Sequence, residues 1–193
     1  MADGFWAWAG LARMPQSLDE PASRHFTWRS LVECGPYSRL TGEGLAIAGP
    51  QEIESWRMLA GLSQVILDQV VDSFGPVELT YAFSGPSMFK HLKGRITTPH
   101  LDQHAAAELN QRRHPVCSRG GAAADFKVPG RSSRELADWI IAELPFDRLY
   151  FYGPRRSVHV SWNAQPMGQA WAMVKGPSGR RLPRPYSGGK GKT

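Results

Sequence analysis

Apolar residues between Glu52 and Phe74 recur at spacings of three and four, which is the period of a helix with one buried face. Gly75 and Pro76 follow directly, and a glycine followed by a proline typically ends a helix. The pattern predicts a long core helix over residues 52–74. Its apolar positions are Trp56, Leu59, Ile66, Leu67, Val70 and Phe74.

The apolar spacing changes to two immediately after this helix. Val77, Leu79, Tyr81 and Phe83 alternate with Glu, Thr and Ala, which predicts a strand over residues 77–83 with these four side chains on its buried face.

A second helix is predicted to begin near Ser132. Ser132 and Glu135 have the spacing of a capping box, and an amphipathic pattern follows them as far as Pro145. Two further apolar segments, 146–152 and 157–162, flank a Gly-Pro turn. These two segments predict an antiparallel hairpin.

Length and composition fit one compact domain. The chain has 193 residues and 41% hydrophobic residues, and single domains commonly hold about 100–200 residues. We expect a loosely ordered segment at 1–25, one domain at 26–175 and a basic flexible tail at 176–193.

The charge balance suits an anionic partner, whether nucleic acid, an anionic wall polymer or a membrane surface. The net charge is +6 and the pI is about 9.6. Aromatic residues do not alternate with the C-terminal charges as a base-stacking surface would require. A solvated tail is therefore favoured over a nucleic-acid surface. The charges concerned are those of Lys175, Arg180, Arg181, Arg184, Lys190 and Lys192.

Cys34 and Cys117 give neither a disulfide framework nor a CxxC zinc motif. The apolar start of the chain lacks a long signal-peptide core, and no segment approaches the roughly 20 apolar residues of a membrane span. We expect a cytoplasmic protein without a membrane span. An extracellular function would require release from the cell by another route, such as host-cell lysis.

Candidate chemistry begins at residues 102–110, where an alanine-rich run favours a helix. His104 and Glu108 are four residues apart and would share a face of that helix. His104 could be a metal ligand or a general base with Asp102 as its orienting carboxylate. Alternatively, Asp102 interacts only with the helix dipole and His104 is a partly exposed side chain.

Five small residues, 120–124, precede Asp125 and indicate a close approach to the backbone. Asp125 opens a strand-like segment and could be a ligand, a partner for Arg119 or a turn former. On the return strand of the hairpin, His159 and Ser161 share one face. If the two strands belong to one sheet, Asp125 and His159 can point into one groove with Tyr152 at its rim.

This order of features resembles the zinc peptidases of the peptidase M15 group, which have the Hedgehog/DD-peptidase fold. The resemblance spans roughly residues 52–163 and rests on the family pattern S-x-H-x-x-G-x-A-x-D and a closing Val-His-Val-Ser. Gly121, Ala123, Asp125 and His159 match it. Ser118 stands where the first zinc-binding histidine belongs, and Tyr152 stands at about the place of the catalytic glutamate.

The resemblance implies an α+β fold with a small, mainly antiparallel sheet packed against helices, and a zinc ion held by His, Asp and His. Two of the three ligands, Asp125 and His159, are present, and His104 could supply the third. Glu108 would then be the nearest candidate base, and Tyr152 a polar or proton-donating neighbour.

Arg119 is expected to anchor a substrate carboxylate, and Asp102, Ser118 and Ser161 are further predicted substrate-binding residues. The leading interpretation is a diverged M15-like metal-dependent hydrolase of peptide-type, wall-peptide-like substrates. The alternative is a non-catalytic protein of the same fold that has lost the zinc site and binds a peptide-like or anionic small ligand.

Overall fold

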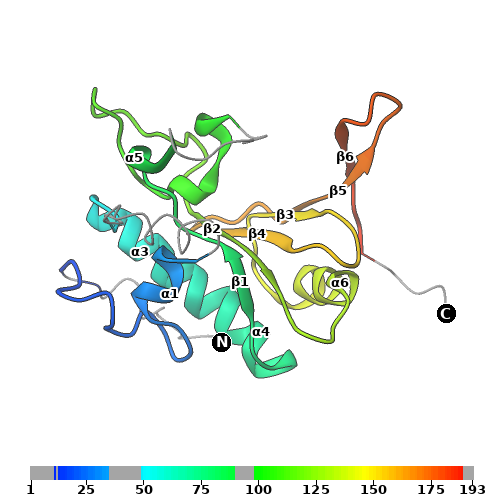
Figure 1. The fold of residues 1–193 in the computed structure, drawn as a ribbon, viewed down its shortest axis with the longest axis horizontal. Coiled ribbons are helices and arrows are strands. Elements are labelled where there is room, and N and C mark those ends of the chain that lie inside the picture. The colour runs from blue at the N-terminus through cyan, green and yellow to red at the C-terminus, as the bar shows by residue number, and fades with distance from the viewer. Residues whose placement is uncertain (1–10, 12, 35–48, 90–97, 189–193) are drawn as a thin grey trace.

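The computed structural model describes residues 11, 13–34, 49–89 and 98–188, which form a mixed α+β fold around a six-stranded sheet (Figure 1). The strand order is β1-β2-β4-β3-β5-β6. All neighbouring strands are antiparallel except β3 and β5, which are parallel. The strands are β1 (Glu78–Tyr81), β2 (Ala122–Lys127), β3 (Arg148–Phe151), β4 (Val158–Trp162), β5 (Gln169–Lys175) and β6 (Arg181–Pro185).

The predicted helix over residues 52–74 is confirmed as one continuous helical segment. It consists of α3 (Ile53–Leu62), the π-helical turn η2 (Ser63–Leu67) and α4 (Asp68–Phe74), and Gly75 ends it with a φ of 91°. The predicted second helix is α6 (Ser133–Glu143), with Ser132 as its N-cap. The remaining helical elements are α1 (Trp28–Val32), α5 (Pro86–Phe89), η3 (Pro99–Leu101) and η4 (Gln103–Ala105).

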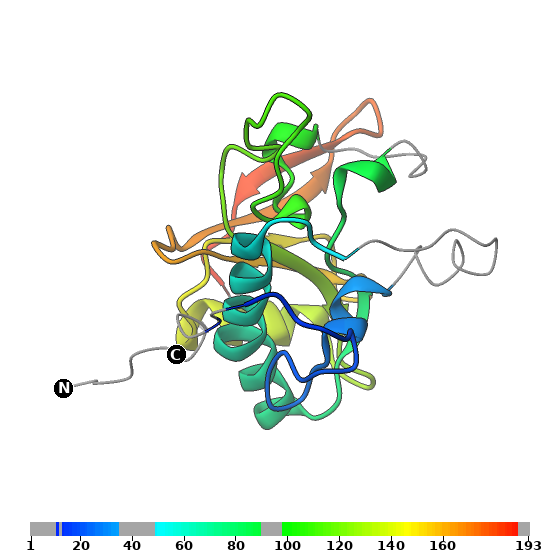
Figure 2. The same cartoon turned by 90° about the vertical axis from the view of Figure 1, so that its left-hand side faces the viewer.

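The long helical segment and α6 cover the same face of the sheet, whereas η3 and η4 lie on the other side (Figures 1 and 2). The helix-facing side chains of the central strands, such as Phe126 and Leu149, belong to one buried apolar cluster with both helices. The approach of α3 is close: a Cβ on Gly61 would lie 2.0 Å from the ring of Trp162. Glycine is therefore needed at position 61 because any side chain would push α3 off the sheet.

The predicted helix over residues 102–110 is wrong: only the 3-10 turn η4 forms there. In an α-helix the carbonyl of His104 would accept from the amide of Glu108, but here it accepts from the amide of Ser84 at 2.8 Å. Ala106 then takes a φ of 48°, which ends the turn. As a result, His104 and Glu108 do not share a helix face.

The strand predicted at 77–83 is shorter and is not regular. In β1, Leu79 pairs with Phe126 and Tyr81 pairs with Asp125, so the register shifts between them. Leu79 packs on the apolar cluster, whereas the Tyr81 ring lies 4.2 Å from the His104 ring, centroid to centroid. The irregularity thus turns Tyr81 away from the predicted buried face.

The described parts of both predicted terminal segments contribute to the fold, whereas residues 1–10, 12 and 189–193 of these segments lie outside the described residues. In the N-terminal segment, the buried Ala22 donates its amide to the carbonyl of Phe26 at 2.9 Å. The predicted flexible tail at 176–193 is corrected because it contains β6, which pairs with β5. Among the described residues, no helix combines the length and apolar character needed to span a membrane.

Candidate metal centre

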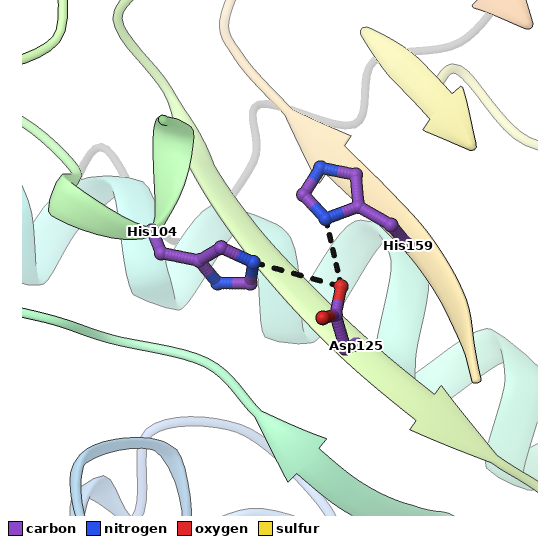
Figure 3. Close-up of side chains that lie close together, drawn as sticks. All are labelled: His104, Asp125 and His159. Carbon is purple, nitrogen blue, oxygen red and sulfur yellow. Dashed lines mark hydrogen bonds and ion pairs between the residues drawn. The ribbon is translucent and has the colours of Figure 1, made fainter. Parts of the chain in front are cut away.

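Three predicted ligands converge on the face of the sheet opposite the long helical segment and α6 (Figure 3). His104 comes from η4, Asp125 from β2 and His159 from β4. Asp125 Oδ1 lies 2.7 Å from His159 Nδ1 and 3.5 Å from His104 Nε2. One ligand atom from each residue lies within 4.8 Å of the others, and no further carboxylate, thiol or imidazole of the described chain joins this cluster.

Strand pairing explains why Asp125 and His159 meet. They are direct partners in the antiparallel pair of β2 and β4, so their side chains stand on the same face. Their neighbours Phe126 and Val158 are also partners, and these face the apolar cluster. The predicted shared sheet and the shared direction of Asp125 and His159 are confirmed.

A backbone carbonyl fixes the ring of His104. Its Nδ1 lies 2.7 Å from the carbonyl oxygen of Ala82, and a carbonyl only accepts, so Nδ1 is the donor. In the neutral ring Nε2 then has no proton and directs its lone pair toward Asp125. A ring nitrogen that donates to a backbone carbonyl in this way is typical of a histidine that binds a metal through its other nitrogen. The predicted orienting partner was Asp102, but its carboxylate accepts the backbone amide of His104 instead, at 3.1 Å.

The residue before His104 attaches η4 to the sheet. The Gln103 amide nitrogen donates to the carbonyl of Gly120 and to the carboxylate of Asp147, both at 2.8 Å. Its oxygen accepts from the hydroxyl of Ser161 at 2.9 Å. Gln103, Asp147 and Ser161 are all buried, so these bonds are not exposed to competition from bulk water.

The distances suit a small tetrahedral ion with modest adjustment. Ligand atoms about 2.0–2.1 Å from zinc stand roughly 3.4 Å apart in a tetrahedron. The 3.5 Å between His104 Nε2 and Asp125 Oδ1 matches this edge. The 2.7 Å between Asp125 Oδ1 and His159 Nδ1 is a hydrogen-bond length, which the exchange of the shared proton for an ion would lengthen. Two imidazoles and one carboxylate form a donor set that zinc commonly takes.

Asp125 and the two imidazoles stabilise one another's charged forms. Burial disfavours the carboxylate of Asp125, but the two imidazoles outweigh it and hold the pKa of Asp125 well below its usual range. Burial likewise disfavours the imidazolium of His104, yet the charge and hydrogen bonding of Asp125 raise the pKa of His104. Asp125 is therefore ionised and ready to bind a cation at any ordinary pH.

An aromatic wall that the sequence did not single out continues the site across β3 and β5. The Tyr150 ring lies 5.2 Å from the His159 ring and stacks on the Trp171 ring at 5.2 Å, centroid to centroid. Arg119 Nη1 donates to the Tyr150 hydroxyl at 3.3 Å and to the Leu101 carbonyl at 3.0 Å. Alternation along β3 is the signal that could have found Tyr150, because it is two residues from Tyr152.

Tyr152, the predicted neighbour of the centre, follows β3 and is half-buried. Burial, helped by the negative charge of Asp125, raises the pKa of Tyr152 to about 12. The phenol is therefore neutral at physiological pH and is a hydrogen-bond donor, not a base.

Two predicted substrate-binding serines have other environments. Ser161 is fully buried, where it bonds Gln103 and accepts the Arg148 amide at 3.0 Å, so its predicted contact with substrate is corrected to a structural role. Ser118 is exposed and donates to the carbonyl of His100 at 3.0 Å. Asp102, also predicted to bind substrate, is buried as the N-cap of η4.

Glu108, the predicted base, is engaged at the start of α3. Its Oε1 accepts from the amides of Gln51 and Glu52, at 3.0 and 3.2 Å, and from the Ser55 hydroxyl at 2.8 Å. This buried carboxylate accepts from backbone N–H groups at the helix N-terminus, which have no partner inside the helix. The structure thus gives Glu108 a helix-capping role.

Comparison with known proteins gave no match to a family model, to a curated protein or to a solved structure.

Proposed function

We propose that this protein is a diverged metal-dependent hydrolase of peptide-type substrates, with a Hedgehog/DD-peptidase-like fold of the peptidase M15 kind. The observation that carries the proposal is the orientation of His104. Its Nδ1 is bonded to Ala82, which leaves Nε2 facing the carboxylate that His159 also contacts. Zinc is the proposed ion, and His104, Asp125 and His159 are its proposed ligands.

A zinc ion at these residues would polarise a substrate carbonyl group and lower the pKa of a water molecule. Arg119 uses Nη1 for both of its hydrogen bonds, so its other guanidinium donors have no partner within the described residues and can receive a substrate carboxylate. Tyr152 can donate a hydrogen bond to negative charge that develops on the substrate, because its raised pKa keeps it protonated. A wall-type peptide with a free carboxylate fits this set of groups.

One observation favours a second candidate, a binding protein that does not turn its ligand over. Hydrolysis needs a base within hydrogen-bond reach of the water. Within the described part of the chain, two carboxylates considered for this base are already engaged: Asp125 is a proposed ligand and Glu108 caps α3. The binding function would use the same Arg119 and Tyr152 to hold a peptide-like or anionic small ligand.

The first test is the zinc content of the protein purified without added metal. We expect close to one zinc per chain, and a loss of at least a hundredfold in zinc affinity for His159→Ala, because two ligands hold zinc weakly. His114→Ala is the matched control, since His114 is exposed and lies outside the cluster. Hydrolysis is then followed by mass spectrometry on peptides released from bacterial cell wall, with chelator and with zinc restored.

Cleavage that chelator stops and zinc restores supports the hydrolase. Zinc binding without cleavage of these peptides, together with retention of the peptide by wild type but not by Arg119→Gln, supports the binding protein instead. A protein that binds no zinc, or a His159→Ala variant that binds as well as wild type, overturns the proposed metal centre.

A further inference from the structure

The β5–β6 hairpin projects from the body of the protein (Figure 1), and it carries two of the most exposed apolar side chains among the described residues. Val174 is 51% exposed and Leu182 is 46% exposed. They are direct partners in the antiparallel pair, so they stand side by side on one face. This face continues the side on which Ala170 and Ala172 pack on the core, but it extends past the helices that would cover it.

Arginines share the face of this apolar pair. Arg184 pairs with Ala172, and Arg180 precedes Leu182 by two residues, so both exposed side chains stand on the same face as Val174 and Leu182. Lys175 and Arg181 pair with each other on the opposite face, where Arg181 bonds the carbonyls of Tyr152 and Met173 and lies over the Tyr152 ring. None of the four forms an ion pair with an acidic side chain within the described residues. The sequence explains the imbalance: residues 148–193 contain nine Lys and Arg and no Asp or Glu. The hairpin is therefore an uncompensated positive surface.

The outer edge of β6 is poorly suited to pairing with another strand. The amide of Tyr186 donates to the carbonyl of Ala170, and the amide of Gly176 donates to the carbonyl of Arg180. In an antiparallel pair every second residue bonds the partner strand, so the nitrogen atoms of Pro183 and Pro185 point outward from the sheet. Proline has no N–H, so the edge lacks donors at these two positions. A second copy added through strand pairing is thus disfavoured, and the side-chain faces remain as the contact surface.

We propose that the β5–β6 hairpin binds the surface of an anionic lipid bilayer. Arg180 and Arg184 would contact the acidic headgroups, and Val174 and Leu182, on the same face, would enter the interfacial layer. The apolar pair decides between anionic partners, because nucleic acid or a wall polymer offers charge but no apolar layer to cover it. This proposal does not depend on the metal centre.

The test is cosedimentation with vesicles made of equal parts phosphatidylserine and phosphatidylcholine, compared with phosphatidylcholine alone. We expect binding to the anionic vesicles only. Since each cation near such a surface contributes about 1 kcal/mol, Arg180→Gln with Arg184→Gln should weaken binding roughly 20- to 30-fold. Val174→Ser with Leu182→Ser should weaken it roughly fivefold, from the loss of apolar burial.

Arg112→Gln with Arg113→Gln is the control, since both arginines are exposed and lie outside the hairpin, and it should leave binding unchanged. Arg113 is paired with Glu52 at 2.7 Å, so Arg112→Gln alone is measured beside the double variant. Circular dichroism and melting temperature confirm that each exposed substitution leaves the fold intact. Absence of binding to the anionic vesicles, or an equal loss in the control, overturns the proposal. Unchanged binding of the Val174→Ser and Leu182→Ser variant also overturns it, because a site for a polyanion needs only the cations.

Discussion

Asp125 and Phe126 are neighbours on β2 that face opposite sides of the sheet, and their surroundings differ in kind. Phe126 is fully buried among apolar side chains of the helices. Asp125 is partly exposed and lies between two imidazoles from other segments of the chain. The helix face is held by many interchangeable apolar contacts, whereas the opposite face depends on a few directional hydrogen bonds.

This difference predicts that stability and metal affinity can be changed separately. Contacts that hold the helices to the sheet determine whether the chain folds. Bonds such as those from Gln103 to Asp147 and from His104 to Ala82 determine where three ligand atoms lie once it has folded. Substitutions on the two faces should therefore move different measurements.

The largest effect is expected from Phe126→Ala. Removal of a fully buried phenylalanine costs about 3–5 kcal/mol of the free energy of unfolding, through lost burial and a cavity. Urea denaturation measures this loss. Zinc affinity of the remaining folded protein should stay within a few-fold of wild type, because Phe126 faces away from the ligands. A hundredfold loss of zinc affinity in folded Phe126→Ala would show that the two faces are not independent.

A smaller effect, on zinc affinity instead of on the free energy of unfolding, is expected from Gln103→Ala. The variant releases η4 from Gly120, Asp147 and Ser161, so His104 should lose its fixed position. Loss of a residue that positions a metal ligand costs about 10- to 100-fold in metal affinity. Isothermal titration with zinc measures the loss. Gln103→Glu keeps an acceptor for Ser161 but places a second carboxylate beside Asp147, so it should not rescue affinity. Wild-type affinity in Gln103→Ala would remove Gln103 from the positioning role.

Sequence periodicity was sufficient for the helix face and for half of the site. Spacings of three and four predicted the helical segment from α3 to α4, and alternation predicted that Asp125 and His159 could face one groove. Both features depend on local patterns and on the pairing of adjacent strands. His104 lies beside Asp125 and His159, although the helix expected to carry it does not form, and its role as a third ligand stays a prediction.

What the sequence could not supply are contacts between distant segments. The amide of Ser84 donates to the carbonyl of His104, so this carbonyl is not used in a helix and the alanine-rich segment forms only a single turn. The carbonyl of Ala82, not the nearby Asp102, orients the ring of His104. Glu108 resembles a catalytic carboxylate by spacing, but Gln51, Glu52 and Ser55 use it at a helix end. Tertiary hydrogen bonds override local propensity at each of these residues.

The smallest predicted effect is a pH dependence that has opposite signs with and without metal. Burial disfavours the charged form of His104, but Asp125 raises its pKa above the value of about 6.5 for an ordinary histidine. In chelator, the ion pair therefore stabilises the fold below the unfolded pKa, and this contribution is lost as pH rises through the folded pKa. Zinc affinity should instead increase with pH, because zinc binds only the unprotonated imidazole. Melting temperatures in chelator and zinc titrations between pH 6 and 9 measure the two trends. In Asp125→Asn the first trend should flatten, since His104 loses its charged partner, and a slope unchanged from wild type would mean that another group carries it.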